Sequence, residues 1–185
     1  MKARVRAFFV GAIVTGAIAI LSGGTYAAFF STTQSDGNGF AAGTVYLQDN
    51  DSGSRMFNAS GMRPSDPPKQ SCITVTYNGT LGAGVRLYAA SVSSTGVEWY
   101  LNLRVETGTS TTGFDDCSGF SAIQTLYDGT LAGYPRTYGG AIVDPDGAWT
   151  TGERHTYRFT VSVQNQAAAQ GMTGSASFTW QARNL

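Results

Sequence analysis

The sequence has 185 residues, of which 12 are lysine or arginine and 12 are aspartate or glutamate, so that 13% are charged. Globular domains carry about 25% charged residues, so this chain is poor in charge, and its balance excludes a strongly basic nucleic-acid-binding protein. With 42% hydrophobic residues it can bury a core, which excludes an intrinsically disordered chain.

The amino terminus has the layout of a secretory signal peptide. Residues 1–6 are basic, residues 7–21 are apolar and uncharged, and a small polar segment comes after them. We expect a signal peptidase to cut between Ala27 and Ala28. The apolar run is shorter than a membrane span requires, but extending it through Phe30 leaves an uncleaved anchor as the alternative. The pattern predicts an exported protein.

Cleavage would change the charge of the protein. It removes Lys2, Arg4 and Arg6 from the 12 basic residues, so nine remain against 12 acidic ones, a formal charge of −3. We therefore expect neither nucleic acid nor an anionic membrane among the partners of the exported chain.

The exported chain begins with a short β-prone segment on a flexible tether. Residues 28–33 read AFFSTT, and the glycine-rich residues 35–39 separate them from the rest of the chain. Neighbouring side chains of a strand point to opposite faces, so Phe29 and Phe30 cannot both be buried by an isolated strand. The candidate donor segment consists of Ala28, Phe29, Phe30, Ser31, Thr32 and Thr33. The residues alone leave two hypotheses equally open: the segment is donated to another molecule, or it pairs with its own sheet as an ordinary first strand or frays.

Residues 40–185 predict a single antiparallel β-sandwich of about eight strands, which comes after the signal peptide (1–27) and the donor segment with its tether (28–39). Apolar and polar residues alternate with period 2 between frequent turns, a pattern typical of sandwiches. The clearest predicted strands are Trp99–Glu106, Arg154–Gln164 and Thr173–Arg183. Weaker ones are Thr44–Gln48, Ser71–Tyr77, Val85–Val92 and Ala122–Tyr127.

Side-chain directions and turns can be predicted from the same pattern. In the first clear strand, Trp99 is expected to face the core and Glu106 to face water. The dipeptides Asn78-Gly79 and Asp128-Gly129 predict hairpin turns, and Asp144–Gly147 predicts a loop.

Cys72 and Cys117 are the only cysteines. In an exported protein they predict a disulfide, with a pair of unlinked buried thiols as the alternative. The bridge would close a loop of about 45 residues and stabilise the fold by roughly 4 kcal/mol in the chain-entropy model.

The sequence predicts no catalytic site, no metal site and no cofactor. A zinc peptidase motif needs two histidines on one helix face, whereas His155 is the only histidine; we expect it to be partly buried at a strand end. No G-x-S-x-G motif is present. Loose calcium sites at Asp49 and Asp51 or at Asp144 and Asp146 stay open as alternatives to solvated turn carboxylates.

The whole chain resembles the TasA and camelysin family of secreted proteins, although only its amino-terminal signature is specific. An apolar run ending in small residues is followed by Ala-Phe-Phe, a polar linker and an Ala-Gly-Thr element. The matching residues are Ala27, Ala28, Phe29, Phe30, Phe40, Ala42, Gly43, Thr44, Val45 and Leu47. A family turn is similar to Gly61–Asp66, where Ser65 replaces the family's glycine, and the closing FTWQARN resembles the family's aromatic last strand.

The resemblance implies a jelly-roll-like sandwich, maturation by a SipW-type signal peptidase, and fibres in which the amino-terminal strand of one subunit fills a groove in the next. We therefore expect a secreted structural subunit of extracellular matrix or cell-surface filaments. It would form a head-to-tail homopolymer, with matrix polysaccharide or accessory fibre proteins as further partners.

Two other functions stay open. One is a monomeric module that binds polysaccharide or cell wall through exposed aromatic side chains, for which the candidates are Tyr88, Tyr100, Tyr134 and Tyr138. The other is a metalloprotease, because camelysin relatives have been described as such. The single histidine favours a protein that is not an enzyme.

Overall fold

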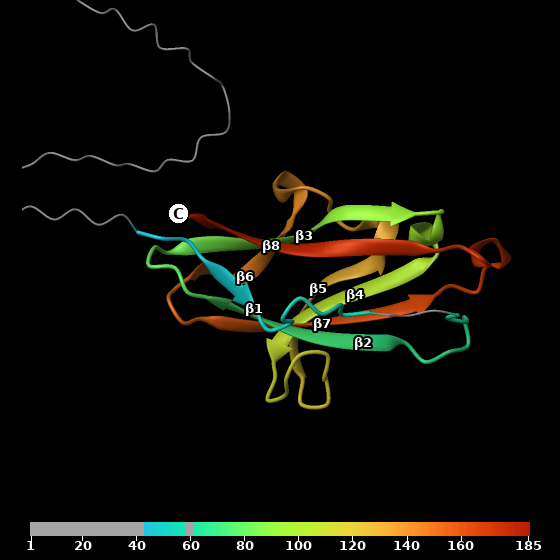
Figure 1. Ribbon diagram of the computed structural model, residues 1–185, viewed down its shortest axis with the longest axis horizontal. Coiled ribbons are helices and arrows are strands. Elements are labelled where there is room, and N and C mark those ends of the chain that lie inside the picture. Colours follow the sequence, from blue (N-terminus) through green and yellow to red (C-terminus); the bar gives the residue numbers. More distant parts are fainter. Residues whose placement is uncertain (1–42, 58–60) are drawn as a thin grey trace, which may run out of the picture. The chain divides into compact units, whose positions relative to one another are not determined.

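The computed structural model describes residues 43–57 and 61–185 (Figure 1). The predicted cleavage between Ala27 and Ala28 and the donor segment, residues 28–33, lie outside the described residues. The division of the chain at residues 27 and 39 therefore stays a prediction. In the part that is described, no helix is long and apolar enough to cross a membrane.

Two antiparallel sheets face each other. The five-stranded sheet has the order β1-β2-β7-β4-β5 and the three-stranded sheet the order β6-β3-β8. The first sheet consists of β1 (Leu47–Asp49), β2 (Lys69–Tyr77), β7 (Arg154–Val163), β4 (Leu101–Thr109) and β5 (Ser121–Thr130). The second consists of β6 (Ile142–Trp149), β3 (Ala83–Ser94) and β8 (Gly174–Asn184). The predicted antiparallel sandwich of about eight strands is confirmed.

The connections between the described strands contain four short 3₁₀ helices. These are η1 (Val97–Trp99), η2 (Leu131–Gly133), η3 (Tyr138–Gly140) and η4 (Ala167–Ala169).

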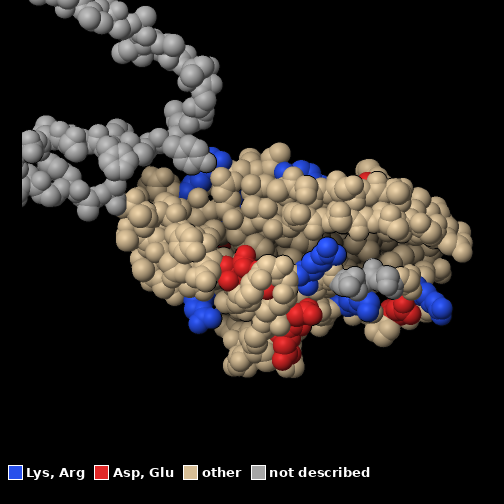
Figure 2. Space-filling model, in the orientation of Figure 1, with Lys and Arg blue, Asp and Glu red and all other residues tan. Residues whose placement is uncertain are grey.

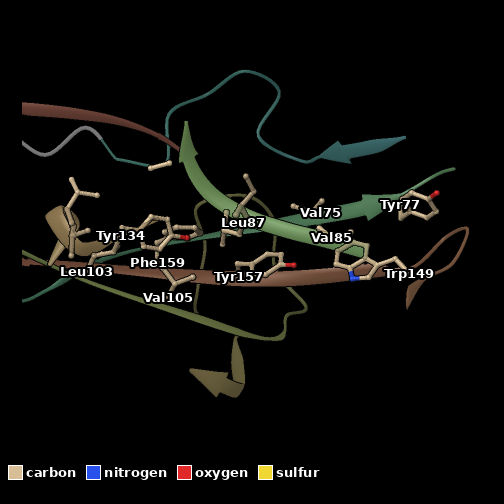
Figure 3. Packing of buried hydrophobic residues seen from close by; sticks show 14 of the residues in the cluster. Val75, Tyr77, Val85, Leu87, Leu103, Val105, Tyr134, Trp149, Tyr157 and Phe159 are labelled. Atoms are coloured by element: carbon tan, nitrogen blue, oxygen red, sulfur yellow. The ribbon is translucent and has the colours of Figure 1, made fainter. Parts of the chain in front are cut away.

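The core fills the space between the inner faces of the two sheets (Figure 3). Alternate residues of β2, β3, β4 and β7 point into it, because successive side chains of a strand point to opposite faces. β7 lies at the centre of its sheet, between β2 and β4, and it contributes the fully buried rings Tyr157 and Phe159. The most buried core side chains include Ile73, Val75, Tyr77, Val85, Leu87, Leu103, Val105 and Trp149.

The disulfide fixes a loop on the outer face of the five-stranded sheet. Cys72 and Cys117 are joined, with their Cα atoms 5.3 Å apart. Cys72 lies in β2 and Cys117 in the connection between β4 and β5, and the backbone N–H of Asp115 donates to the carbonyl of Cys72 at 2.8 Å. The ring of Phe120 in this loop lies under the guanidinium of Arg158, 4.6 Å from its carbon.

Two predicted side-chain directions in β4 are wrong. Trp99 does not face the core: it lies in η1, before the strand begins, and is 65% exposed. Glu106 does not face water, because the disulfide-linked loop covers this part of the outer face and leaves it 6% exposed. Its carboxylate accepts hydrogen bonds from Arg158 at 2.7 and 2.9 Å, which compensates for the burial.

The hairpin turn predicted at Asp128-Gly129 is also wrong. Asp128 and Gly129 lie within β5, paired with Arg104 and Leu103 of β4. The predicted loop at residues 144–147 falls within the bounds of β6, but these four residues have no partners in β3, because the register of the pair shifts there. A proline is tolerated there because β6 is an edge strand, where a missing N–H need not break a ladder bond.

Candidate functional site

A cluster of three carboxylates and one imidazole joins the two sheets at one end of the core. It consists of Asp144, Asp146, Glu153 and His155, and we call it the carboxylate–histidine cluster. The two aspartates belong to β6 of the three-stranded sheet, Glu153 precedes β7, and His155 is the second residue of β7. Asp144 and Asp146 lie in the stretch of β6 that is not paired with β3, and Glu153 lies in the following turn, so the cluster forms where the chain passes from β6 to β7.

Asp144 is the buried anchor of the cluster. Its carboxylate accepts hydrogen bonds from Trp149 Nε1 at 3.1 Å and from the Tyr157 hydroxyl at 2.6 Å, and it lies 3.0 Å from His155 Nδ1. Burial by itself raises the pKa of Asp144, but the hydrogen bonds from His155, Tyr157 and a backbone N–H outweigh burial and lower the pKa below its ordinary value. Asp144 is therefore a buried carboxylate held in its charged form.

His155 lies between Asp144 and two further carboxylates. Its Nε2 is 3.2 Å from Asp146 Oδ2 and 3.2 Å from Glu153 Oε1. Burial by itself lowers the pKa of His155, but the hydrogen bond to Asp144 and the negative charges of all three carboxylates raise it above its ordinary value. The prediction that His155 is partly buried near a strand end agrees with this position, since 15% of its side chain is exposed.

Glu153 is held by the turn that connects β6 and β7. Its Oε2 accepts from the backbone N–H of Thr150 at 2.8 Å and from the Thr150 hydroxyl at 3.1 Å. Its Oε1 is buried and accepts no hydrogen bond from the described residues. This leaves Oε1 directed at the imidazole Nε2, next to Asp146.

The second candidate feature is the free edge of β8, to which no second strand is hydrogen-bonded among the described residues, although β1 approaches β8. β8 pairs with β3 along one edge only. Its inward-facing residues Ala176, Phe178, Trp180 and Ala182 are only half-buried, although they pack against the core. The ring of Phe178 lies 4.6 Å from that of Phe159, so one side of the edge ring touches the core while part of it stays exposed.

The surface along β8 carries little charge. From Gly174 to Ala182 the strand has no charged residue and no proline, and the face shown in Figure 2 is mostly uncharged over this strand. Edge strands are commonly protected by charges, prolines or bulges, because their unpaired N–H and C=O groups can pair with another chain. The middle of β8 has neither charged residues nor a proline to protect it.

Other predicted site residues are distributed over the molecule. Asp49 is the last residue of β1 and Asp51 follows the strand, and neither belongs to the group of possible metal ligands found among the described residues. The predicted aromatic platform is not formed as a set, because Tyr134 is only 1% exposed and packs edge-on against Tyr127 and Phe178.

Together these features define an exposed-edge β-sandwich protein with a carboxylate–histidine cluster between its sheets. Residues 2–92 match the model of a family described as camelysin metallo-endopeptidase. The chain belongs to this family, which is the same TasA/camelysin family that its sequence resembles. No curated protein matches the chain.

Proposed function

We propose that this chain is a secreted structural subunit that polymerises non-covalently into extracellular filaments of a matrix or cell surface. In this proposal the donor segment of one subunit, residues 28–33, pairs with the free edge of β8 in the next. A SipW-type signal peptidase would release the donor segment during export, as in the family that the sequence resembles. The observation that carries the proposal is the long, uncharged and half-covered edge of β8.

A comparison of the four sheet edges favours β8 as the acceptor. β1 has only three residues, and β6 contains Pro145 and the charged Asp144 and Asp146. β5 contains Asp128 and has two register shifts against β4, which twist an edge away from a flat partner. β8 has 11 residues and no charge before Arg183, so it offers the longest continuous row of N–H and C=O groups to an added strand.

Side-chain packing gives a second reason. A strand beside β8 would place its inward side chains next to Phe178 and Trp180, flanked by the small Ala176 and Ala182. An arriving phenylalanine would complete the cover of these rings, and full burial of such a side chain contributes about 1.5–3 kcal/mol. Because Phe29 and Phe30 are adjacent, one of them would point into the core and the other outward.

The donor and acceptor surfaces differ, so the contact would be head-to-tail and need not close into a ring. The result is a homopolymer that grows as a filament. Matrix polysaccharide and accessory fibre proteins are further partners that this proposal allows, while the mild negative charge disfavours nucleic acid.

The test is electron microscopy of protein beginning at residue 28, beside a form that lacks residues 28–33. A double variant, Phe29→Ser with Phe30→Ser, keeps the segment length as a control for spacing. We expect filaments from the intact form and few or none from the other two. Filaments of undiminished length from the truncated form would overturn the proposal.

We also propose that the chain is not a peptidase, although the family description includes this activity. The support is the donor set: the sequence contains one histidine, whereas the zinc peptidase motif needs two on one helix face. Casein hydrolysis by the purified protein, lost on treatment with a chelator and restored by zinc, would contradict this. A stable monomer that is retained on polysaccharide would instead support the binding-module alternative.

A further inference from the structure

We propose that Asp146, Glu153 and His155 bind a divalent cation of the zinc type. The three residues offer one ligand atom each, and these atoms all lie within 4.8 Å of one another. The family description implies a metal but assigns no ligands, so the assignment rests on the geometry of this chain. It is independent of the filament proposal.

The separations suit coordination. His155 Nε2 lies 3.2 Å from both Asp146 Oδ2 and Glu153 Oε1. Zinc binds imidazole nitrogen and carboxylate oxygen at about 2.0–2.2 Å in tetrahedral arrangements, which places neighbouring ligand atoms roughly 3.4 Å apart. The two carboxylate oxygens lie within 4.8 Å of each other, so rotation of the exposed Asp146 side chain would bring all three atoms onto one ion.

The far side of the imidazole is arranged as in metal sites. A histidine that binds a metal through one nitrogen commonly donates the other N–H to a carboxylate, which fixes its tautomer and orientation. Here Asp144 lies 3.0 Å from Nδ1, and Asp144 is itself fixed by Trp149 and Tyr157. If Nδ1 keeps its proton and a metal ion takes the place of the proton on Nε2, the Nε2 lone pair is directed at that ion, next to the two carboxylates.

Two carboxylates facing a lone pair require a cation between them. A positive charge is needed most at Glu153 Oε1, because this oxygen is buried and accepts no hydrogen bond from the described residues. A proton on Nε2 or a bound metal ion can meet the need. Asp146 is 62% exposed in its side chain, so an ion could enter from solvent and keep an open coordination position there.

The donor set selects the class of metal. Imidazole is a preferred ligand of zinc and of other late first-row metals, whereas calcium takes six to eight oxygen ligands and magnesium prefers oxygen. One imidazole nitrogen with two carboxylates therefore favours zinc over calcium and magnesium.

Isothermal titration of the purified protein, prepared without a histidine tag and stripped with EDTA, tests the proposal. We expect one zinc ion per chain, with calcium and magnesium binding at least tenfold more weakly. Asp146→Asn is expected to weaken zinc binding at least tenfold. Asp128→Asn removes the same charge from a similarly exposed residue, 68% exposed, and is expected to bind zinc as the unaltered protein does.

A second measurement locates the ion. Because the chain has one histidine, a ¹⁵N-histidine spectrum reports on His155 alone. We expect zinc to shift the Nε2 resonance and leave Nδ1 protonated. Absence of zinc binding, an unshifted Nε2 resonance, or equal zinc affinity in the Asp146→Asn and Asp128→Asn variants would overturn the proposal in favour of a protonated ring.

Discussion

The hydroxyl of Tyr157 donates a 2.6 Å hydrogen bond to the carboxylate of Asp144, and this bond joins the two sheets of the sandwich. Tyr157 belongs to β7 of the five-stranded sheet and Asp144 to β6 of the three-stranded sheet. Both side chains are buried, so the bond is shielded from water. A charged acceptor makes such a bond about twice as strong as a neutral pair.

Removing this acceptor should destabilise the fold strongly. Asp144→Ala leaves the Tyr157 hydroxyl and Trp149 Nε1 without their partner, and we expect the free energy of unfolding to fall by about 3–5 kcal/mol. Urea unfolding followed by tryptophan fluorescence measures the change. The exposed variant Asp128→Asn should stay within about 0.5 kcal/mol of the unaltered protein, and a similar value for Asp144→Ala would contradict the anchoring role.

The disulfide should contribute measurably to stability. Replacing Cys72 and Cys117 together with alanine opens the loop closed by their 45-residue separation, and we expect a loss of about 4 kcal/mol in the chain-entropy model. Urea unfolding without reductant measures this loss. Adding reductant should lower the free energy of unfolding of the unaltered protein to that of the double variant and leave the variant's value unchanged. If reductant also destabilises the variant, the loss has a cause other than the disulfide.

Phe159 and Phe178 should separate folding from assembly. Phe159 is fully buried, so Phe159→Ala should cost about 3–5 kcal/mol of stability. Phe178 is half-buried, so Phe178→Ala should cost only roughly 1–2 kcal/mol while shortening filaments, since its ring lines the proposed acceptor edge. Chemical denaturation and electron microscopy give the two readouts, and filaments of normal length from Phe178→Ala would place the acceptor elsewhere.

A lysine on the proposed acceptor edge should block assembly without unfolding the protein. Ser177 is exposed in the middle of β8, and a charge on an edge strand disfavours added strands. We expect Ser177→Lys to suppress filaments while unfolding stays within about 0.5 kcal/mol. Val143→Lys is the matched control, because Val143 is exposed on the already protected edge strand β6. Suppression by both variants alike would indicate a general charge effect.

Much of the fold can be predicted from the period-2 pattern. The strand predicted at Ser71–Tyr77 appears as β2, and Arg154–Gln164 appears as β7 with Tyr157 and Phe159 inward. These strands can be predicted because one face of each packs against the core, which makes apolar and polar residues alternate. Trp99 breaks the pattern because Gly96, at φ 113°, turns the chain into η1 just before β4.

The carboxylate–histidine cluster is harder to predict for a different reason. Its members come from β6, from the turn that follows it and from β7, and Asp-Pro-Asp-Gly is typical of a loop, although it lies within the bounds of β6. The signal in the sequence is a shared spacing: Asp144 and Asp146 are two apart, as are Glu153 and His155. This spacing does not by itself place the two pairs together; only the tertiary fold shows that the unpaired stretch of β6 meets the start of β7.

Pro145 gives the sandwich an asymmetry that matters for assembly. It protects β6, one edge of the three-stranded sheet, while β8 at the opposite edge stays permissive. In the proposed filament each subunit then has one acceptor edge and one donor segment. The filament therefore grows without branches. A subunit without residues 28–33 accepts but cannot donate, so small amounts of it added to intact protein would terminate chains and set their length.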